Sequence, residues 1–311
     1  MNYRALGNTG SELSVLGFGA APLGGEYGAV DPAEATRSVH VAIDYGINFF
    51  DTSPYYGRTV SEQRLGAALA GKREKVVVCT KCGRYGFDEF DFSAARVTAS
   101  LDESLQRLRT DYVDLLIAHD IEFGDREQVL SETIPAMRKL QEIGKTQFVG
   151  ISGLPLKILI DVAQRGNVDF VLSYCHYNLM IRDLDRELAQ LAKSKGFGLI
   201  NASPLHMGML TPAGPPSWHP AAIEVKEAAA EIVRLCQSRG ADITAVALRF
   251  CLDYPNVAST LVGMNTPAQV QRNIKALEYT IDPELLRHIE RVIAPVAGTT
   301  WPSGRPENTD V

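Results

Sequence analysis

Short apolar runs alternate with helical patterns along most of this chain. The apolar runs, among them INFF, VVVCT and DYVDLLIA, are continuous and rich in β-branched or aromatic residues. They are too short for helices and are typical of strands buried on both faces of a parallel sheet. The first helical pattern begins after Asp31, a suitable N-cap, with Pro32 in its first turn.

This alternation predicts eight parallel strands behind a short N-terminal hairpin around YRALGNTGSEL. Short connections between strands and helices imply right-handed βαβ units, and eight of these close a barrel. We therefore predict an α/β fold, a (β/α)8 TIM barrel with an N-terminal β-hairpin and extra helices, as a single domain over residues 1–311. The predicted strands are 15–19, 47–50, 75–80, 112–118, 146–151, 168–173, 197–202 and 258–262, and the predicted helices are 32–45, 60–70, 93–108, 127–143, 155–164, 182–195, 221–238, 242–253, 267–276 and 283–292.

Two longer segments interrupt the alternation of predicted strands and helices: residues 205–220 and the C-terminal loop or tail 294–311. Long loops in a compact domain are usually functional or disordered. Both segments follow elements whose carboxyl-terminal side should approach the barrel mouth, so we expect them to contribute to a substrate pocket. For the tail beyond Pro302, a frayed surface end is an equally good interpretation of the sequence.

Four polar residues lie at or beyond the ends of three successive predicted strands. Asp51 follows INFF, Tyr56 lies five residues further on, Lys81 follows VVVCT, and His119 follows DYVDLLIA. Parallel strands point their carboxyl ends toward one face, and in a (β/α)8 barrel that face holds the active site. The sequence therefore predicts an acid–base site with a carboxylate, a phenol, an ammonium and an imidazole.

These four groups suit the reversible oxidation of an alcohol. A phenol is a poor base at neutral pH because its ordinary pKa is about 10. A nearby ammonium stabilises the phenolate, so we expect Lys81 to lower the pKa of Tyr56 and Asp51 to hold the lysine. Tyr56 would then act as acid in one direction and base in the other, with His119 orienting the substrate oxygen or relaying its proton. Taken singly, each residue could instead be structural.

Composition and charge narrow the function classes. The chain has 311 residues, a formal net charge of −6, a pI near 5.6 and no cluster of Lys and Arg. These properties argue against nucleic-acid and membrane-surface roles. No apolar run approaches the roughly 18 residues of a membrane span, and the N-terminus lacks the pattern of a signal peptide. We therefore expect a cytoplasmic protein, a monomer or weak homodimer, without nucleic-acid or membrane partners.

The five cysteines are odd in number and have no disulfide-type spacing. Cys79 and Cys82 match the C-x-x-C spacing of redox and zinc motifs, but no second pair follows at metal-ligand spacing. The pair also ends a strand instead of opening a helix. We expect free cysteines that serve as small core residues, and no metal site.

Longer segments resemble a known enzyme family. GINFFDTSPYYG, TKCGRYG and SLQRLRTDYVDLLIAHD are similar to signature segments of the aldo-keto reductases, and the resemblance runs from VLGFGA to NTPAQVQRNI. It implies a (β/α)8 barrel that transfers hydride between a nicotinamide cofactor and a carbonyl or alcohol. It also implies catalytic roles for Asp51, Tyr56, Lys81 and His119.

A narrower resemblance is to the L-galactose dehydrogenase branch of that family, through SPYYG, TKCGRY, AHDIEFG, LSYCHY, GPPSWHPA and TWPSG. It implies NAD-dependent oxidation of an aldose at its C1 hydroxyl to the aldonolactone, in particular L-galactose to L-galactono-1,4-lactone. Related branches act on L-fucose, D-arabinose or pyridoxal, and these substrates stay open. Two alternative hypotheses belong to other functional classes. One is a Schiff-base lyase that uses Lys81, and the other is a non-catalytic regulatory subunit with the same fold.

No G-x-G-x-x-G stands between a strand and a helix, so a Rossmann fingerprint is absent. The resemblance instead implies a dinucleotide held across the barrel mouth. Gly153 stands where the family usually has Asn, and Leu172 or Ser173 where it has Gln. The implied cofactor-binding residues are Gly19, Ala20, Ser152, Gly153, Ser173, Ser203, Leu205, Gly208, Gly263, Asn265, Gln269, Arg272 and Asn273.

The same resemblance bears on the choice between NAD and NADP. NADPH-preferring relatives place Lys-Ser before the last barrel helix and an Arg within it, where they bind the 2′-phosphate. A phosphate requires such cationic partners. The corresponding positions here are Gly263, Met264 and Gln269, and Arg272 is the nearest cation in the sequence. We therefore predict NAD as the preferred cofactor.

Several residues expected near the barrel mouth offer hydrogen-bonding groups and aromatic surface, as sugar recognition requires. We expect substrate contacts from Tyr55, Asp120, His206 and Trp218. For Arg84 and Glu122, a surface location is nearly as good an interpretation.

Overall fold

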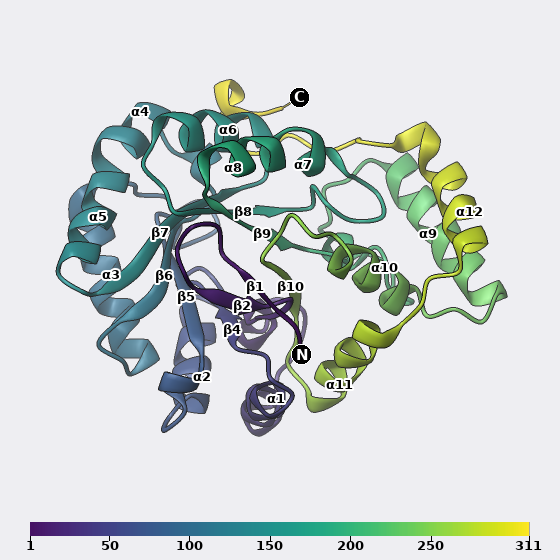
Figure 1. Ribbon diagram of the computed structural model, residues 1–311, viewed down its shortest axis with the longest axis horizontal. Coiled ribbons are helices and arrows are strands. Elements are labelled where there is room, and N and C mark those ends of the chain that lie inside the picture. The colour runs from purple at the N-terminus through teal and green to yellow at the C-terminus, as the bar shows by residue number, and fades with distance from the viewer. Residues whose placement is uncertain (311) are drawn as a thin grey trace.

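The computed structural model describes residues 1–310, and within them eight parallel strands close a barrel. Each strand pairs with the next along the chain, and the last pairs back with the first. The predicted (β/α)8 fold is therefore confirmed, with helices around the barrel (Figure 1). The strands are β3 (Leu16–Gly19), β4 (Phe49–Asp51), β5 (Val77–Cys82), β6 (Val113–Ala118), β7 (Thr146–Gly153), β8 (Phe170–Tyr174), β9 (Gly198–Ala202) and β10 (Ser259–Gly263).

The predicted helices are present, although two of them are interrupted. The stretch 127–143 contains a π-helical segment at Val129–Thr133, and the stretch 182–195 divides at Glu187. A single extra residue in a helical turn leaves the apolar periodicity nearly unchanged, so the sequence does not reveal such a break. Among residues 1–310, no helix is both long and apolar enough to cross a membrane. The helices are α1 (Pro32–Asp44), α2 (Val60–Ala68), α3 (Ala94–Leu108), α4 (Arg126–Gln128), α5 (Ile134–Glu142), α6 (Leu156–Arg165), α7 (Asp183–Arg186), α8 (Leu188–Lys195), α9 (Ile223–Ser238), α10 (Ile243–Leu252), α11 (Pro267–Lys275) and α12 (Pro283–Ile293).

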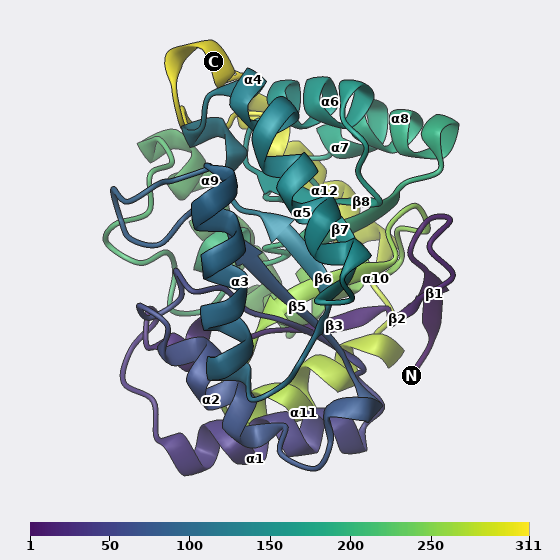
Figure 2. The same ribbon diagram turned by 90° about the vertical axis from the view of Figure 1, so that its left-hand side faces the viewer.

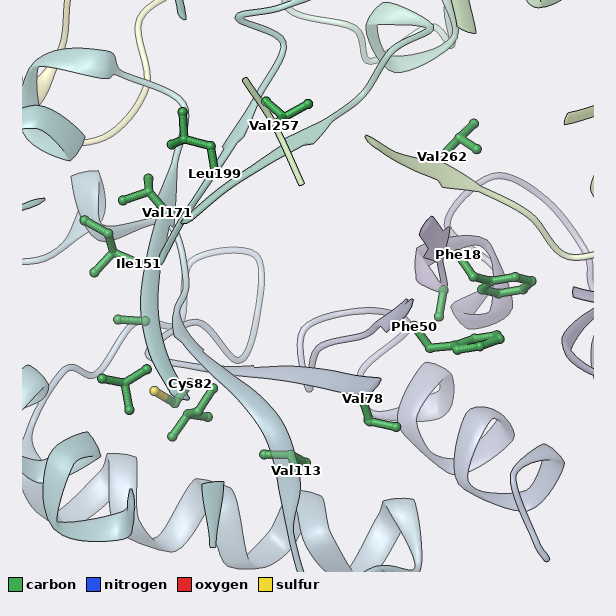
Figure 3. Packing of buried hydrophobic residues seen from close by; sticks show 14 of the residues in the cluster. Phe18, Phe50, Val78, Cys82, Val113, Ile151, Val171, Leu199, Val257 and Val262 are labelled. Carbon is green, nitrogen blue, oxygen red and sulfur yellow. The ribbon is translucent and has the colours of Figure 1, made fainter. Parts of the chain in front are cut away.

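Alternate residues of each strand enter two different hydrophobic layers. Phe18, Phe50 and Val78 belong to the layer between strands and helices (Figure 3). Phe49 and Cys79 belong to a separate cluster inside the barrel. This division follows from strand geometry, in which successive side chains point to opposite faces. It also decides which polar residues at the strand ends face the barrel interior.

The N-terminal hairpin, β1 (Tyr3–Ala5) and β2 (Glu12–Ser14), covers the floor of the barrel. Leu6 and Leu13 from this hairpin are fully buried in the interior cluster. Gly7 has a positive φ of 53°, and a Cβ there would lie 2.4 Å from the backbone nitrogen of Gly198 at the start of β9. The hairpin therefore seals the end of the barrel opposite the strands' carboxyl ends.

The C-terminal segment returns from α12 to the barrel and ends beside α4 and α6 (Figures 1 and 2). It contains a short 3-10 turn, η8 (Pro306–Asn308), in which Asn308 is fully buried. The carboxylate of Asp310 accepts hydrogen bonds from the backbone N–H groups of Leu156 and Lys157, at 2.7 and 2.9 Å. The interpretation of residues beyond Pro302 as a frayed end is therefore wrong, since long-range hydrogen bonds hold them in place.

Candidate active site

Strand geometry explains why three of the predicted residues meet. In β4, β5 and β6, the last interior hydrophobic residues are Phe49, Cys79 and Ile117. A side chain two positions further along a strand shares the same face, so the next inward positions at the carboxyl ends are polar. These positions hold Asp51, Lys81 and His119. Tyr56 joins them from the loop after β4.

Asp51 and Lys81 form a buried ion pair. The Lys81 ammonium donates to Asp51 Oδ1 over 2.6 Å and to the carbonyl oxygen of Thr52 over 2.7 Å. Burial by itself lowers the pKa of Lys81, but Asp51 and Tyr56 outweigh it, so the pKa lies above its ordinary value. Lys81 is therefore a fixed cation at neutral pH. Because a Schiff-base lysine attacks as a neutral amine, this environment disfavours the lyase reading.

Tyr56 is partly exposed, and the Lys81 Nζ atom lies 4.7 Å from its ring centroid. Burial of the phenol raises the pKa of Tyr56 above its ordinary value, the Lys81 cation opposes this, and Asp51 and Asp120 add to the rise. The expectation that Lys81 lowers this pKa is right for that single interaction and wrong for the net shift. The spacing of residues identifies the charged neighbour but does not give the desolvation.

His119 is buried against the Tyr56 ring and against Ser53, a residue not predicted to belong to the site. Its Nδ1 atom lies 3.1 Å from the Ser53 hydroxyl, and its ring meets the Tyr56 ring edge-on with centroids 5.7 Å apart. Burial lowers the pKa of His119 to about 3, assisted by Lys81 and Arg84 and opposed by Asp120. The imidazole is therefore neutral at physiological pH. The sequence signal for Ser53 was its position between Asp51 and Tyr56.

Asp120 and Arg84 form a second buried ion pair beside this group. Arg84 donates to Asp120 Oδ2 over 2.5 Å, and its guanidinium lies 3.9 Å from the Tyr55 ring centroid. The same Asp120 oxygen lies 3.7 Å from His119 Nε2. Asp120 has a left-handed backbone with φ of 53°, which is uncommon outside glycine. The surface interpretation of Arg84 is wrong, because its charge is paired and its stem is largely buried.

The remaining residues predicted to contact substrate differ in exposure. Trp218 is 52% exposed, and its ring lies 6.0 Å from that of Tyr27, which belongs to the loop after β3. His206 is fully buried, with Nδ1 3.0 Å from the Asn178 amide and its ring edge-on to Trp301. Trp218 is therefore available at the surface, whereas His206 packs inside the loop that follows β9.

The cysteines behave as expected. All five are free and buried. Within residues 1–310, no group of three or more His, Cys, Asp or Glu side chains is arranged to hold a metal ion. Burial raises the pKa of the Cys82 thiol to about 12, which makes this cysteine an unreactive core residue.

Comparison with known proteins agrees with this geometry. The sequence model of the aldo/keto reductase family matches residues 15–294 of this chain. The chain belongs to the aldo/keto reductase family. It is 50% identical to the L-galactose dehydrogenase of Arabidopsis thaliana over 318 aligned residues, which cover 99% of each chain. It is 29% identical to D-threo-aldose 1-dehydrogenase from a Pseudomonas species, over 85% of this chain and 89% of the relative.

A solved structure supports the same assignment. The aldo-keto reductase AKR11C1 from Bacillus halodurans, in its holo form, superposes with a TM-score of 0.78 at 25% identity, and the match covers all of both chains. As a member of the aldo/keto reductase family, this protein is an oxidoreductase that uses a nicotinamide cofactor.

Several residues of the loop after β9 have left-handed backbone conformations. Ser203, His206, Met207 and Gly208 all have positive φ, between 48° and 98°. Runs of left-handed and right-handed residues form concavities lined by backbone N–H groups, which bind anions. The predicted pyrophosphate contacts at Ser203, Leu205 and Gly208 lie in this loop, where the N–H groups of His206 and Gly208 donate to the carbonyl oxygens of Ser203 and Leu205. Its binding of a phosphate stays a prediction.

The predicted nicotinamide contacts divide between the two faces of their strands. Gly153 of β7 pairs with Ser173 of β8, and Ser152 with Leu172. Leu172 belongs to the interior cluster, so Ser173 has the outward orientation. Ser152 faces inward, where its hydroxyl lies 3.4 Å from the Asp120 N–H. The structure therefore favours Leu172 over Ser173 as the residue of β8 that faces the site.

The residues predicted at the adenosine end lie around the start of α11. Gly263, at the end of β10, is exposed and pairs with Gly19 across the barrel seam. Ala20, the next residue after Gly19, is buried, and its N–H bonds to the carbonyl oxygen of Asp51. The remaining predicted residues around α11 differ in exposure and bonding: the Gln269 side chain accepts from the Asn265 N–H at 2.8 Å, Asn273 is buried, and Arg272 is exposed.

Proposed function

We propose that this protein oxidises an aldose at its anomeric C1 hydroxyl to the aldonolactone, with NAD as cofactor and L-galactose as the substrate. The main support is the 50% identity to L-galactose dehydrogenase over nearly the full length of both chains. The adjacent side chains of Asp51, Tyr56, Lys81 and His119 give this oxidation a chemical basis. Similarity to D-threo-aldose 1-dehydrogenase supports the wider substrate class.

In this proposal Tyr56 is the general base. A bound nicotinamide supplies the hydride acceptor. Tyr56 takes the proton from the C1 hydroxyl, and the fixed positive charge of Lys81 stabilises the phenolate. Because burial holds the pKa of the phenol above its ordinary value, oxidation becomes faster as pH rises and Tyr56 loses its proton.

In this proposal His119 orients the substrate oxygen and does not relay its proton. With a pKa of about 3, its imidazole is neutral and carries one N–H. A neutral imidazole can donate a hydrogen bond to the substrate oxygen without competing with Tyr56 for the proton. Ser53 fixes the ring through Nδ1, since its hydroxyl also accepts from the Tyr55 N–H at 3.1 Å.

The mouth of the barrel suits a polar ring. Asp120 and Arg84 offer charged hydrogen-bonding groups, while Tyr55 and the exposed Trp218 offer aromatic surface. Sugar sites combine these two kinds of contact. Since pyridoxal also carries polar groups, the 50% identity to L-galactose dehydrogenase is what favours an aldose over pyridoxal in this proposal.

A substrate screen tests this function. Reduction of NAD⁺ should be fastest with L-galactose and slower with L-fucose, D-arabinose and pyridoxal, as measured by absorbance of the reduced cofactor. Identification of the lactone as the product would support oxidation at C1. Faster turnover of pyridoxal than of every aldose would contradict the proposal.

The cofactor preference needs a separate measurement. Exposed Gly263 and the engaged Gln269 offer no cation to a 2′-phosphate. A missing charge-assisted hydrogen bond corresponds to about tenfold or more in affinity, so kcat/KM should favour NAD⁺ over NADP⁺ by at least that factor. The same ratio is measured in Arg272→Ala, which removes the exposed cation of α11 nearest to Gln269 in the sequence. Higher kcat/KM with NADP⁺, lost in Arg272→Ala, would overturn the preference.

A further inference from the structure

Glu122, two residues after Asp120, is a fully buried carboxyl group that none of the roles above uses. Its Oε1 atom accepts hydrogen bonds from the Leu154 N–H at 3.1 Å and from the Ser303 hydroxyl at 2.9 Å. Its Oε2 atom has no hydrogen-bond partner within residues 1–310. One side chain thus joins the loops after β6 and β7 to the C-terminal segment. The interpretation of Glu122 as a surface residue is wrong.

The backbone of Glu122 is bound by the same C-terminal segment. Its carbonyl oxygen accepts from the Arg305 N–H and from the Asn308 side-chain amide, both at 2.9 Å. Gly304 has φ of 84°, and a Cβ there would lie 2.4 Å from this carbonyl oxygen. Such close packing over 181 positions of sequence separation indicates a specific contact.

The C-terminal segment also reaches the loop after β9. Trp301 is 9% exposed and packs edge-on against His206 and His219, with ring centroids 5.6 and 5.3 Å apart. At its other end, Asp310 accepts from the first N–H groups of α6. Residues 301–310 therefore form a strap across three loops on the catalytic face, and Glu122 is the buried point at which the strap meets the loops after β6 and β7.

Gly153 has a structural explanation in this arrangement. A Cβ on Gly153 would lie 2.5 Å from Glu122 Oε2. The carboxyl group therefore occupies the space in which a side chain at position 153 would begin. This accounts for the glycine where the family resemblance suggests asparagine.

The charges around Glu122 favour its neutral form. Burial raises the pKa of this carboxyl to about 8, and the negative charge of Asp120 contributes. Tyr174 faces it from β8, and Arg84, from the loop after β5, is paired with Asp120. Arg305 from the strap bonds to the carbonyl oxygen of Phe123, with Asp125 3.8 Å away. None of these groups neutralises a carboxylate at Oε2.

We propose that Glu122 is a positioning residue, which holds the His119–Asp120 segment in its catalytic geometry by joining the loops after β6 and β7 to the C-terminal strap. Protonated Glu122 accepts both hydrogen bonds at Oε1 and leaves no buried charge. Its ionisation places a second buried carboxylate next to Asp120, which destabilises the folded arrangement although the hydrogen bonds from Leu154 and Ser303 favour the charged form.

The Glu122 carboxyl binds its proton more tightly in the folded state than in the unfolded state. The unfolded carboxyl has an ordinary pKa near 4.5 and the folded one about 8, so the folded state binds the extra proton between these values. Stability from this group therefore falls as pH rises from about 4.5 to about 8 and then levels off. Glu122→Gln keeps the Oε1 acceptor without the charge. The stability of this variant should therefore not show this decrease as pH rises.

The test compares Glu122→Gln and Glu122→Ala with wild type in the full chain. Glu127→Gln is the matched control, because Glu127 is 68% exposed and bonds Arg165 on the surface. We measure Tm from pH 5 to 9, and kcat and KM for NAD⁺-dependent L-galactose oxidation from pH 6 to 10. Glu122→Gln should keep kcat near wild type at pH 7 and gain Tm relative to wild type as pH rises. Glu122→Ala should lose about tenfold or more in kcat, as expected when catalytic groups are misplaced.

Two results would overturn the proposal. One is a Tm for Glu122→Gln that runs parallel to wild type from pH 5 to 9, since this arm needs no substrate and is independent of the proposed reaction. The other is an unchanged kcat in Glu122→Ala. If Glu122→Ala does not fold, Ser303→Ala replaces it. That variant should lower kcat at unchanged NAD⁺ affinity, and an unchanged kcat would contradict the role.

Discussion

Burial moves the pKa values of Tyr56 and His119 in opposite directions, because it disfavours the charged form of each. The phenol holds its proton more tightly, and the imidazole loses it more readily. The two neighbours thus receive distinct roles although their rings touch. An imidazole with a pKa of about 3 is a poor proton acceptor at neutral pH, which supports the proposed role of Tyr56 as the base.

Removal of the Tyr56 hydroxyl tests this assignment. Tyr56→Phe should lower kcat by about 100-fold or more, the usual effect of losing general acid–base catalysis. Binding of the reduced cofactor, followed by fluorescence, should stay within a factor of two or so, because the ring remains in place. Tyr45→Phe, at a residue 46% exposed on the surface, is the control. Nearly full activity in Tyr56→Phe would contradict the role.

The neutral state of His119 has a consequence for stability. The unfolded imidazole takes up a proton near pH 6.5, whereas the folded one does so near pH 3. Stability from this group therefore falls as pH drops through that range, by up to about 1.4 kcal/mol per pH unit. His119→Gln should flatten the decrease of Tm below pH 6.5. An imidazole NMR signal from His119 with a midpoint near 6.5 would exclude the neutral assignment.

At the scale of elements, α6 begins without a cap of its own. Its N-cap is Pro155, which has no side-chain acceptor, and the strap supplies Asp310 in its place. An anionic acceptor at a helix N-terminus satisfies free N–H groups and interacts favourably with the helix dipole. The C-terminus of the chain therefore completes a helix that begins three residues after Gly153.

Loss of this distant cap should destabilise the protein modestly. Asp310→Ala should cost about 0.5–2 kcal/mol in the free energy of unfolding, the range measured for N-cap removal. The amide protons of Leu156 and Lys157 should exchange faster. Asp310→Asn keeps an acceptor and should recover most of the loss. Equal stability of Asp310→Ala and wild type in urea unfolding would argue against the cap.

At the scale of the whole molecule, the barrel has one open and one covered end. The hairpin inserts Leu6 and Leu13 below the interior cluster, so the polar groups at the other end face the entry. We therefore expect ligands to enter at the face that holds Asp51, Lys81 and His119.

The covered end should contribute strongly to stability. Leu13→Ala should cost about 2–5 kcal/mol, the range for removing a fully buried leucine side chain. Ile143→Ala, at a residue 66% exposed, should change the free energy of unfolding by less than about 0.5 kcal/mol. Equilibrium urea denaturation measures both. A similar small effect of the two variants would show that the hairpin does not support the barrel.

Much of this architecture could be predicted from sequence because it depends on local periodicity. Continuous apolar runs indicated the eight strands, and Asp31 with Pro32 marked the start of α1, where the Asp31 carboxylate accepts from two N–H groups. The meeting of Asp51, Lys81 and His119 could also be predicted, since side chains two apart share a strand face and strand ends share a barrel face. Their catalytic roles, and that of Tyr56, stay a proposal.

Only the tertiary structure decided the properties that depend on distant partners. The net pKa shift of Tyr56 depends on the desolvation produced by the assembled mouth. The burial of Glu122 depends on Ser303, which is 181 positions away. A sequence pattern records the chemistry of each group and its nearest neighbours, whereas solvent exclusion and long-range hydrogen bonds exist only once the chain has closed the barrel and laid the strap across it.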